Sequence, residues 1–385
     1  MTKPAKRGVP KLGVYVHWPY CARICPYCDF NVFKDRGGEE PAALARAIVA
    51  DLEAQAEAAG PRELASIFLG GGTPSLMDPA WAAEIVSVAR RLWTAALDLE
   101  VTLEANPTDA EAARFAAFAE AGVNRLSLGL QSLDDVALRF LGRNHDAATA
   151  IRAAEAAARA FPRLSIDLIY ARPGQTPDAW ARELEAAIGL GAEHVSPYQL
   201  TIEAGTAFDR AVRRGRFMPP DADTGAALFD TTQQVLEAAG FDAYEVSNHA
   251  RGAAARSRHN LIYWQGHDYL GVGPGAHGRI TVAGARQATH AAARPADYIG
   301  CVAATGVGFS EPEVLGAREA AQERLLSGLR ITEGVPLADV AALAIPAETI
   351  AGLTRLGLLA EDPLRLRATP AGRLVLDRLT AELAA

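Results

Sequence analysis

The sequence predicts an α/β protein: a partial (β/α)6 TIM-like barrel followed by a small C-terminal α+β domain of winged-helix type. Short β-type runs alternate with longer Ala-rich helical stretches over the first two thirds of the chain, as in βαβ units around a parallel sheet. Polar and thiol side chains then follow the predicted strand ends, where a barrel of this kind carries its working residues. We expect a barrel domain at 1–250, a linker region at 251–310 and the C-terminal domain at 311–385.

The six barrel strands and their helices have ordinary sequence signals. The predicted strands are Gly13–Trp18, Ser66–Leu69, Leu99–Glu104, Arg125–Leu130, Leu164–Tyr170 and His194–Leu200. Helices are expected to begin at Asp78-Pro79 and Thr176-Pro177, because each pair reads as an N-cap followed by proline in the first turn. Gly122 and Gly240 suit helix C-termini, since each ends an Ala-rich run.

The chain changes character after about residue 310. Short helices are followed by a predicted hairpin, whose arms at 358–362 and 364–368 flank a proline, and by a helix from Pro370 onward. Winged-helix modules often bind DNA, but the wing here has few basic residues. We therefore favour a role for this domain in packing against the rest of the protein. A metal-stabilised DNA-binding regulator is a weaker alternative that rests on this domain alone.

Composition excludes several classes of protein. The 385 residues carry 38 Lys+Arg against 46 Asp+Glu, a net charge of −8, which argues against a nucleic-acid partner held by a basic surface. No signal peptide is evident, and the longest uncharged stretches fall short of the ~20 apolar residues of a membrane span. We therefore expect a cytoplasmic protein without stable membrane insertion, in which thiols stay reduced.

Three of the four cysteines form a CxxxCxxC group, and the fourth, Cys301, is remote. Cys21, Cys25 and Cys28 supply three soft thiolates, which select zinc, copper(I) or iron–sulfur clusters. A structural zinc site needs four ligands, and no second Cys or Cys/His pair is present to complete one. Three cysteines holding a 4Fe-4S cluster would leave one iron open to a small chelating molecule.

This arrangement after the first predicted barrel strand resembles the radical S-adenosylmethionine (SAM) superfamily. The resemblance implies a 4Fe-4S cluster on the three cysteines and SAM on the open iron. It also implies SAM-binding residues at strand ends: Tyr15, Gly72, Thr73, Glu104, Gln131, Arg143 and Asp167. Taken alone, each of these residues could have a purely structural role; the triple glycine at 70–72, for example, suits a tight turn.

The resemblance is closer to one branch of the superfamily, the oxygen-independent coproporphyrinogen III oxidase group. The matching strings are YVHWPYC at 15–21, FLGGGTP at 68–74, EANP at 104–107, GLQS at 129–132 and IDLIY at 166–170. This group contains the oxidases, which decarboxylate a porphyrinogen, and the HemW-type haem chaperones, which bind haem and deliver it to haem proteins.

Three features favour the chaperone branch. The oxidases continue the cluster motif to a further cysteine, whereas this chain reads Cys28-Asp29-Phe30, the CxF form of the chaperones. The oxidases also have a longer extension before the cluster, where this chain has 20 residues. Finally, the segment from His259 to Trp264 matches the HNxxYW motif associated with haem binding.

The resemblance makes His259 the predicted haem ligand, since imidazole ligates haem iron and neighbouring aromatic rings shield the macrocycle. His249, His267 and His277 are rivals nearby in sequence. The segment from Gly271 to His277 is either a second ligand segment or a turn.

One departure from the family pattern affects the pocket. Tyr170-Ala171-Arg172-Pro173 stands where the family usually reads Tyr-Gly-Leu-Pro, so we expect Arg172 to add a cation near the pocket mouth.

The resemblance therefore predicts a haem chaperone whose partners are haem and apo-haem proteins, respiratory ones among them. A porphyrinogen-modifying radical SAM enzyme is the alternative. Productive cleavage of SAM, covalent attachment of haem and a homodimeric state all stay open.

Overall fold

The computed structural model describes residues 9–384 and contains one large sheet of twelve strands. Its centre is six parallel strands in chain order: β1 (Lys11–Trp18), β4 (Glu63–Gly71), β5 (Thr94–Ala105), β6 (Arg125–Gln131), β7 (Arg163–Tyr170) and β8 (His194–Gln199). Each overlaps a strand predicted from the sequence. The predicted six-strand α/β core is therefore confirmed.

Further strands extend this core at both edges, and within residues 9–384 the sheet does not close into a barrel. Beyond β8 lie β10 (Asn248–Ala250) and β9 (Asp242–Glu245). Beyond β1 lie β11 (Asp268–Val272), β12 (His277–Val282), β13 (Ala285–His290) and β14 (Glu313–Val314). β11 runs parallel to β1, whereas β12 and β13 form an antiparallel hairpin. Residues 251–310, expected as a linker, thus contain regular structure that continues the sheet, and the three-part division of the chain stays a prediction.

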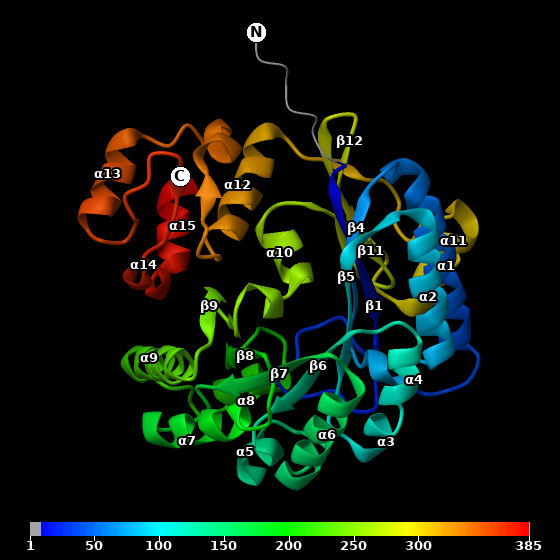
Figure 1. Cartoon of the computed structure of the whole chain (residues 1–385), viewed down its shortest axis with the longest axis horizontal. Coiled ribbons are helices and arrows are strands. Elements are labelled where there is room, and N and C mark those ends of the chain that lie inside the picture. The colour runs from blue at the N-terminus through cyan, green and yellow to red at the C-terminus, as the bar shows by residue number, and fades with distance from the viewer. Residues whose placement is uncertain (1–8, 385) are drawn as a thin grey trace.

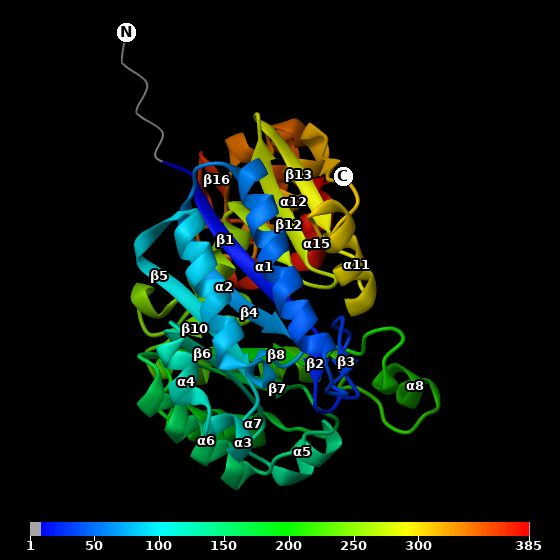
Figure 2. The same cartoon turned by 90° about the vertical axis from the view of Figure 1, so that its right-hand side faces the viewer.

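Helices cover the outer face of the sheet. They include α1 (Glu40–Ala59), α2 (Pro79–Leu92), α3 (Asp109–Ala112), α4 (Phe115–Glu120), α5 (Asp135–Phe140), α6 (Ala147–Ala160), α7 (Pro177–Ile188), α9 (Ala222–Ala238) and α11 (Pro295–Thr305). Figure 2 looks onto this layer, with α1 and α2 in front of β1. Leu44, Ile48 and Leu52 recur at helical spacing on the buried side of α1, which packs against the apolar strands.

The helix boundaries follow the predicted signals. Asp78 caps α2 by accepting a hydrogen bond from the Ala80 amide at 2.9 Å, and Thr176 caps α7 through the Ala179 amide at 3.3 Å. Gly122 and Gly240 follow α4 and α9 with positive φ values of 97° and 79°. These start and stop predictions are confirmed.

One short helix, α10 (Arg258–Trp264), lies on the opposite face of the sheet from α1 and α2 (Figure 1) and contacts β1, β4 and β11. Its N-terminus is held by Glu100, a β5 residue that is 1% exposed. The carboxylate accepts hydrogen bonds from the amides of Arg258 and His259 at 3.1 and 3.0 Å, and Arg163 contacts it at 2.8 Å. A buried anion at a helix N-terminus is favourable, so this contact positions the helix.

The C-terminal residues form a separate apolar core around Leu325, Val335, Leu353, Leu366 and Leu379. Its elements are α12 (Ala317–Gly328), β15 (Val335–Pro336), α13 (Ala347–Arg355), β16 (Arg365–Leu366), α14 (Pro370–Leu374) and α15 (Leu376–Ala384). The helix expected from Pro370 is present, with a break at residue 375.

The predicted hairpin of this domain forms only in part. Its two arms meet at the bridge between Leu359 and Ala368, and the second arm pairs with β15 instead. The domain packs on α10, where the Arg324 guanidinium donates to the Trp264 carbonyl at 3.0 Å.

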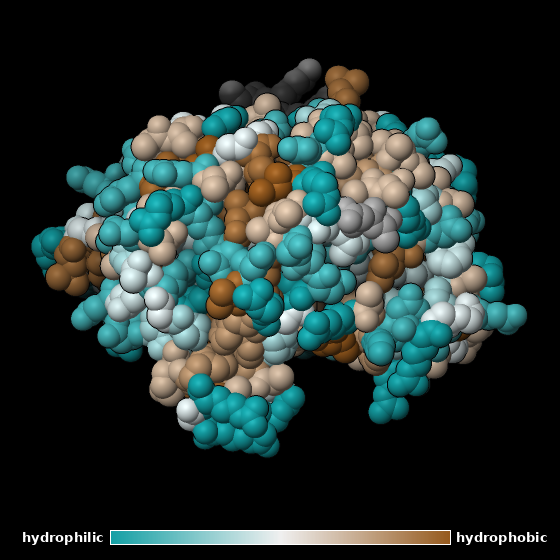
Figure 3. Space-filling model, turned by 90° about the horizontal axis from the view of Figure 1, so that it is seen from below, coloured by the Kyte–Doolittle hydropathy of each residue, from teal (hydrophilic) through white to brown (hydrophobic). Residues whose placement is uncertain are grey.

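No helix among residues 9–384 is both long enough and apolar enough to cross a membrane. On the face seen in Figure 3, hydrophilic residues are widespread and the hydrophobic ones fall into separate patches.

Arg172 does not lie at a pocket mouth, which corrects the expectation from the sequence. It is 7% exposed and turns toward α7, where its guanidinium pairs with Glu183 and with the Ser132 hydroxyl. Ala171, which stands where the family has glycine, adopts a positive φ of 59° and turns the chain there.

We expect Arg172→Ala to lower the free energy of unfolding by about 3 kcal/mol, because it leaves the Glu183 carboxylate buried without its cation. The double variant Arg172→Ala/Glu183→Ala should lose clearly less than the sum of the two single losses. Urea denaturation of the four proteins measures this cycle, and strictly additive losses would contradict a coupled pair.

Candidate functional site

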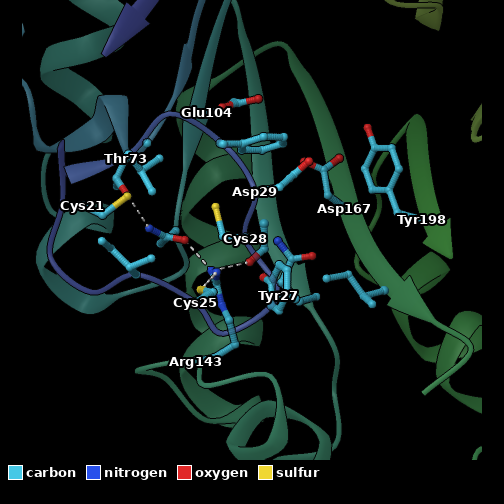
Figure 4. Close-up of a pocket in the computed structure, with 18 of the residues that line it drawn as sticks. Cys21, Cys25, Tyr27, Cys28, Asp29, Thr73, Glu104, Arg143, Asp167 and Tyr198 are labelled. Atoms are coloured by element: carbon cyan, nitrogen blue, oxygen red, sulfur yellow. Dashed lines mark hydrogen bonds between the residues drawn. The ribbon is translucent and has the colours of Figure 1, made fainter. Parts of the chain in front are cut away.

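The three clustered cysteines lie on one loop beyond the carboxyl end of β1 (Figure 4). Cys21 ends the short strand β2 (Tyr20–Cys21), which pairs with β3 (Phe33–Lys34) as the loop returns. The Cys28 amide donates to the Cys25 carbonyl at 3.2 Å, which closes a turn between these two residues. All three are free thiols.

The loop covers a cavity of about 450 Å³ at the carboxyl ends of the parallel strands. Its lining includes all three cysteines together with Gly72, Thr73, Glu104, Gln131, Arg143 and Asp167. The structure therefore gathers nine of the eleven predicted site residues around one space, and Figure 4 shows most of them facing it. The two exceptions, Tyr15 and His259, lie elsewhere.

The glycine-rich turn after β4 packs directly against the cysteine loop. The Gly72 amide donates to the Trp18 carbonyl at 2.7 Å, and the Thr73 amide donates to the Tyr20 carbonyl at 2.9 Å. A Cβ atom on Gly72 would lie 2.7 Å from the Pro19 carbonyl carbon. Glycine is therefore needed here so that the two backbones can approach each other.

Arg143 and Asn106 support the thiol side of the cavity. The Arg143 guanidinium lies 3.4 Å from the Cys25 sulfur and donates to the Gly129 carbonyl at 3.0 Å. It also contacts the Asn106 amide oxygen, and Asn106 in turn donates to the Thr73 hydroxyl at 3.0 Å. Arg143 therefore ties the cysteine loop to the strand ends and places a positive charge beside the Cys25 sulfur.

For the other two thiols burial outweighs the help they receive, such as the hydrogen bond that the Thr73 hydroxyl donates to the Cys21 sulfur at 3.5 Å. Burial raises the pKa of Cys21 above its ordinary value, and burial raises the pKa of Cys28 to about 11. These thiols become thiolates most readily when a metal supplies positive charge.

Two carboxyl groups, Glu104 and Asp167, form the opposite wall. Glu104 is the penultimate residue of β5 and accepts a hydrogen bond from the Gly71 amide at 3.0 Å. Burial raises the pKa of Glu104 to about 8, and the negative charge of Asp167 adds to the rise. Burial also raises the pKa of Asp167, against the hydrogen bond that its carboxylate accepts from Ser127 at 2.8 Å. This wall is suited to a ligand that carries amine or hydroxyl donors.

Gln131 stands where the ladder between β6 and β7 is irregular. The register shifts between Leu128 and Gln131, and Gln131 has a positive φ of 64°. A non-glycine residue in this conformation is uncommon and often marks a functional site.

Tyr15 lies on the other side of Glu104, in a second cavity beside β1. Its hydroxyl hydrogen-bonds with the His17 Nδ1 atom at 2.9 Å.

His259 lines neither cavity. It is 1% exposed, and both of its ring nitrogens have partners: the Ser66 hydroxyl at 2.9 Å and the Tyr263 hydroxyl at 2.7 Å. Burial lowers the pKa of His259 to about 3, so the ring is neutral. The motif residue that reaches a cavity is Tyr263. In this arrangement His259 offers no free nitrogen to an iron, and its predicted axial role is not supported by the geometry.

The donor set fits an iron–sulfur cluster better than a single ion. Within residues 9–384 no three His, Cys, Asp or Glu side chains converge closely enough to hold one metal ion. Three thiols spread around a cavity suit a cluster, in which each iron takes its own thiolate.

Several residues of this site were missed from the sequence. Asn106 links Thr73 to Arg143, and its signal was present in the string EANP at 104–107. Tyr198 and Gln199 line the cavity from the end of β8, where the strand-end rule points. Tyr27 and Ser127 had no distinctive signal.

Fold and site together define a protein of the radical SAM class. The sequence profile of the Radical SAM superfamily matches residues 15–187, and that of the HemN C-terminal domain matches residues 315–375. Among solved structures, coproporphyrinogen III oxidase (HemN) from Escherichia coli superposes with a TM-score of 0.81. The match covers 98% of this chain and 91% of that one at 20% identity, which shows the fold alone.

Relatives that match over most of their length identify the family within this superfamily. The chain is 38% identical over 374 residues to the heme chaperone HemW of Mycobacterium tuberculosis, covering 96% of this chain and 94% of that protein. It is 40% identical over 390 residues to the bovine mitochondrial radical S-adenosyl methionine domain-containing protein 1, covering 98% and 88%. HemW of Escherichia coli is 41% identical over 71% of each chain. This chain belongs to the radical SAM superfamily, in the family that contains HemW.

The raised pKa of Glu104 predicts a pH dependence in the protein without its cluster. Between pH 4.5 and about 8 this carboxyl holds a proton in the folded state but not in the unfolded state. The folded state binds more protons in that window, so its stability falls as the pH rises through it.

Replacing Glu104 with Gln should remove this loss. Between pH 5 and pH 8 the unfolding free energy of the wild type should fall by about 2 kcal/mol more than that of Glu104→Gln. This value allows for the partial exposure of the Glu104 side chain to solvent. Urea denaturation at several pH values measures the difference. Parallel pH profiles for the two proteins would contradict a raised pKa.

Proposed function

We propose that this protein is a haem chaperone that binds a 4Fe-4S cluster and SAM, takes up haem and delivers it to apo-haem proteins. The observation that carries the proposal is its 38% identity to HemW of Mycobacterium tuberculosis over nearly the whole of both chains. The CxF sequence at Phe30 and the HNxxYW motif at 259–264 support the same branch. We place this activity in the cytoplasm, where reducing conditions keep thiols free.

In the proposed site, Cys21, Cys25 and Cys28 hold the cluster and the rest of the cavity receives SAM. When bound, the pair supplies one-electron chemistry. Glu104 keeps its proton below about pH 8 and faces the cavity, so it can donate or accept a hydrogen bond there. The SAM residues we assign are Gly72, Thr73, Glu104, Gln131, Arg143 and Asp167.

Arg143 holds the cysteine loop against the strand ends of the sheet. It joins Cys25 on the cysteine loop to Gly129 on β6, so one side chain connects the proposed cluster and SAM parts of the cavity. Its guanidinium also offsets negative charge on a thiolate-bound cluster.

Replacing any one of Cys21, Cys25 or Cys28 with Ser should remove most of the bound iron after anaerobic reconstitution, because serine is a poor ligand for a soft iron–sulfur cluster. Cys301→Ser is the matched control: Cys301 lies on α11, outside the cavity, and should keep the wild-type iron content. Iron and sulfide analysis measures both. A requirement for Cys301 would overturn the three-ligand assignment.

The chaperone and oxidase functions are separated by testing both on one cluster-loaded preparation. We expect ferric haem to bind and then to appear in an apo-haem protein, measured by the absorption spectrum of the recipient. Coproporphyrinogen supplied with SAM and a reductant should remain unchanged on chromatography. Its decarboxylation would support the oxidase instead.

A further inference from the structure

A second cavity of about 470 Å³ lies beside the cluster cavity, between β1 and the hairpin of β12 and β13. Aromatic side chains provide much of its wall: Tyr15, Phe30, Tyr263 and Tyr269. Phe30 is 64% exposed, which is unusual for so large an apolar ring. A concave aromatic space of this size suits a flat, largely apolar ligand.

Two histidines, His277 and His290, stand at this cavity on paired positions of the hairpin. Their rings are stacked, with centroids 4.1 Å apart and planes 12° from parallel, and both residues are exposed. No residue among 9–384 hydrogen-bonds with any of their four ring nitrogens. Burial, His290 and Arg279 lower the pKa of His277, which favours the neutral imidazole that binds metals.

The other histidines near this cavity have no nitrogen to spare. His17 also lines it, but its Nδ1 atom hydrogen-bonds with Tyr15 and its Nε2 atom with the Asn31 carbonyl at 2.8 Å. His259 is buried behind Tyr263, with both nitrogens engaged. The hairpin histidines are therefore the ones placed to ligate a metal inside this space.

We propose that the second cavity is the haem site and that the His277–His290 pair supplies the axial nitrogen to the haem iron. The inference rests on the proposed haem-chaperone function and names its binding site. An imidazole nitrogen donates its lone pair to ferric iron and displaces a water, with no change in oxidation state. The aromatic wall contacts the macrocycle, which adds shape selection to the bond.

This assignment gives the HNxxYW motif a positioning role. His259 accepts or donates the 2.7 Å hydrogen bond with the Tyr263 hydroxyl, and Glu100 fixes the helix that carries both residues. Tyr263 then packs edge-on against Tyr269, with ring centroids 4.4 Å apart, to form one wall of the cavity. His259 acts on haem through this wall and not through the iron.

The test titrates ferric haem into the full-length, cluster-reconstituted protein and its variants, with affinity and the electron paramagnetic resonance spectrum of the haem iron as readouts. We expect His277→Ala/His290→Ala to lose the imidazole-ligated signal and to bind haem at least tenfold more weakly. Added free imidazole should restore that signal. His259→Ala should keep the imidazole-ligated signal, even where its affinity falls. His267→Ala, outside the cavity, is the matched control and should behave as wild type.

Two results would overturn the site: an unchanged signal in the double variant, or loss of the signal in His259→Ala alone. The single variants show which ring ligates the iron. His277 and His290 are exposed, so circular dichroism and thermal unfolding of the double variant should match the wild type. A wild-type protein that binds no haem at all would instead overturn the proposed function, and the site with it.

Discussion

The parallel pairing of β1 with both of its neighbours determines where everything else can lie. β4 pairs with β1 on one side and β11 on the other, both in parallel, so the carboxyl ends of all three strands meet at one edge. The cysteine loop leaves β1 at that edge, and the glycine-rich turn leaves β4 beside it. The two cavities consequently flank β1, one under the cysteine loop and one toward the hairpin of β12 and β13.

Buried charge holds the second of these cavities in shape. The buried Glu100 carboxylate has Arg125 and Arg163 as cations and the first amides of α10 as hydrogen-bond donors. Such a carboxylate is tolerated in the interior only when it is this fully paired. Because the helix N-terminus is one of its partners, Glu100 ties α10 to β5, and the helix also contacts β4 and β1.

Much of this architecture could be predicted from local sequence. The six strands, the caps at Asp78 and Thr176 and the cysteine loop all depend on residues that are close together in the sequence. The strand-end rule also brought residues as distant as Thr73 and Asp167 to one cavity. These are features for which hydrophobic periodicity and turn chemistry carry the signal.

The sequence was least informative where partners distant in the chain decide which side chains and strands meet. β11 pairs with β1 although the two strands are some 250 residues apart, and the residues of β11 do not indicate which strand it pairs with. His259 reads as a ligand from its neighbours in the chain, but Ser66 occupies one nitrogen and Tyr263 the other. Arg172 reads as a pocket cation, but Glu183 on α7 draws it away. Periodicity does not report which side chains meet across elements.

The wall between the cavities has a thermodynamic consequence. Phe30, Gly71 and Glu104 border both spaces. A molecule that moves Phe30 or shifts the proton of Glu104 as it binds on one side changes the surface met by a molecule on the other. Linkage would then require each to alter the other's affinity by the same factor, so the proposed cofactor and the proposed cargo would be allosteric effectors of one another across a shared wall.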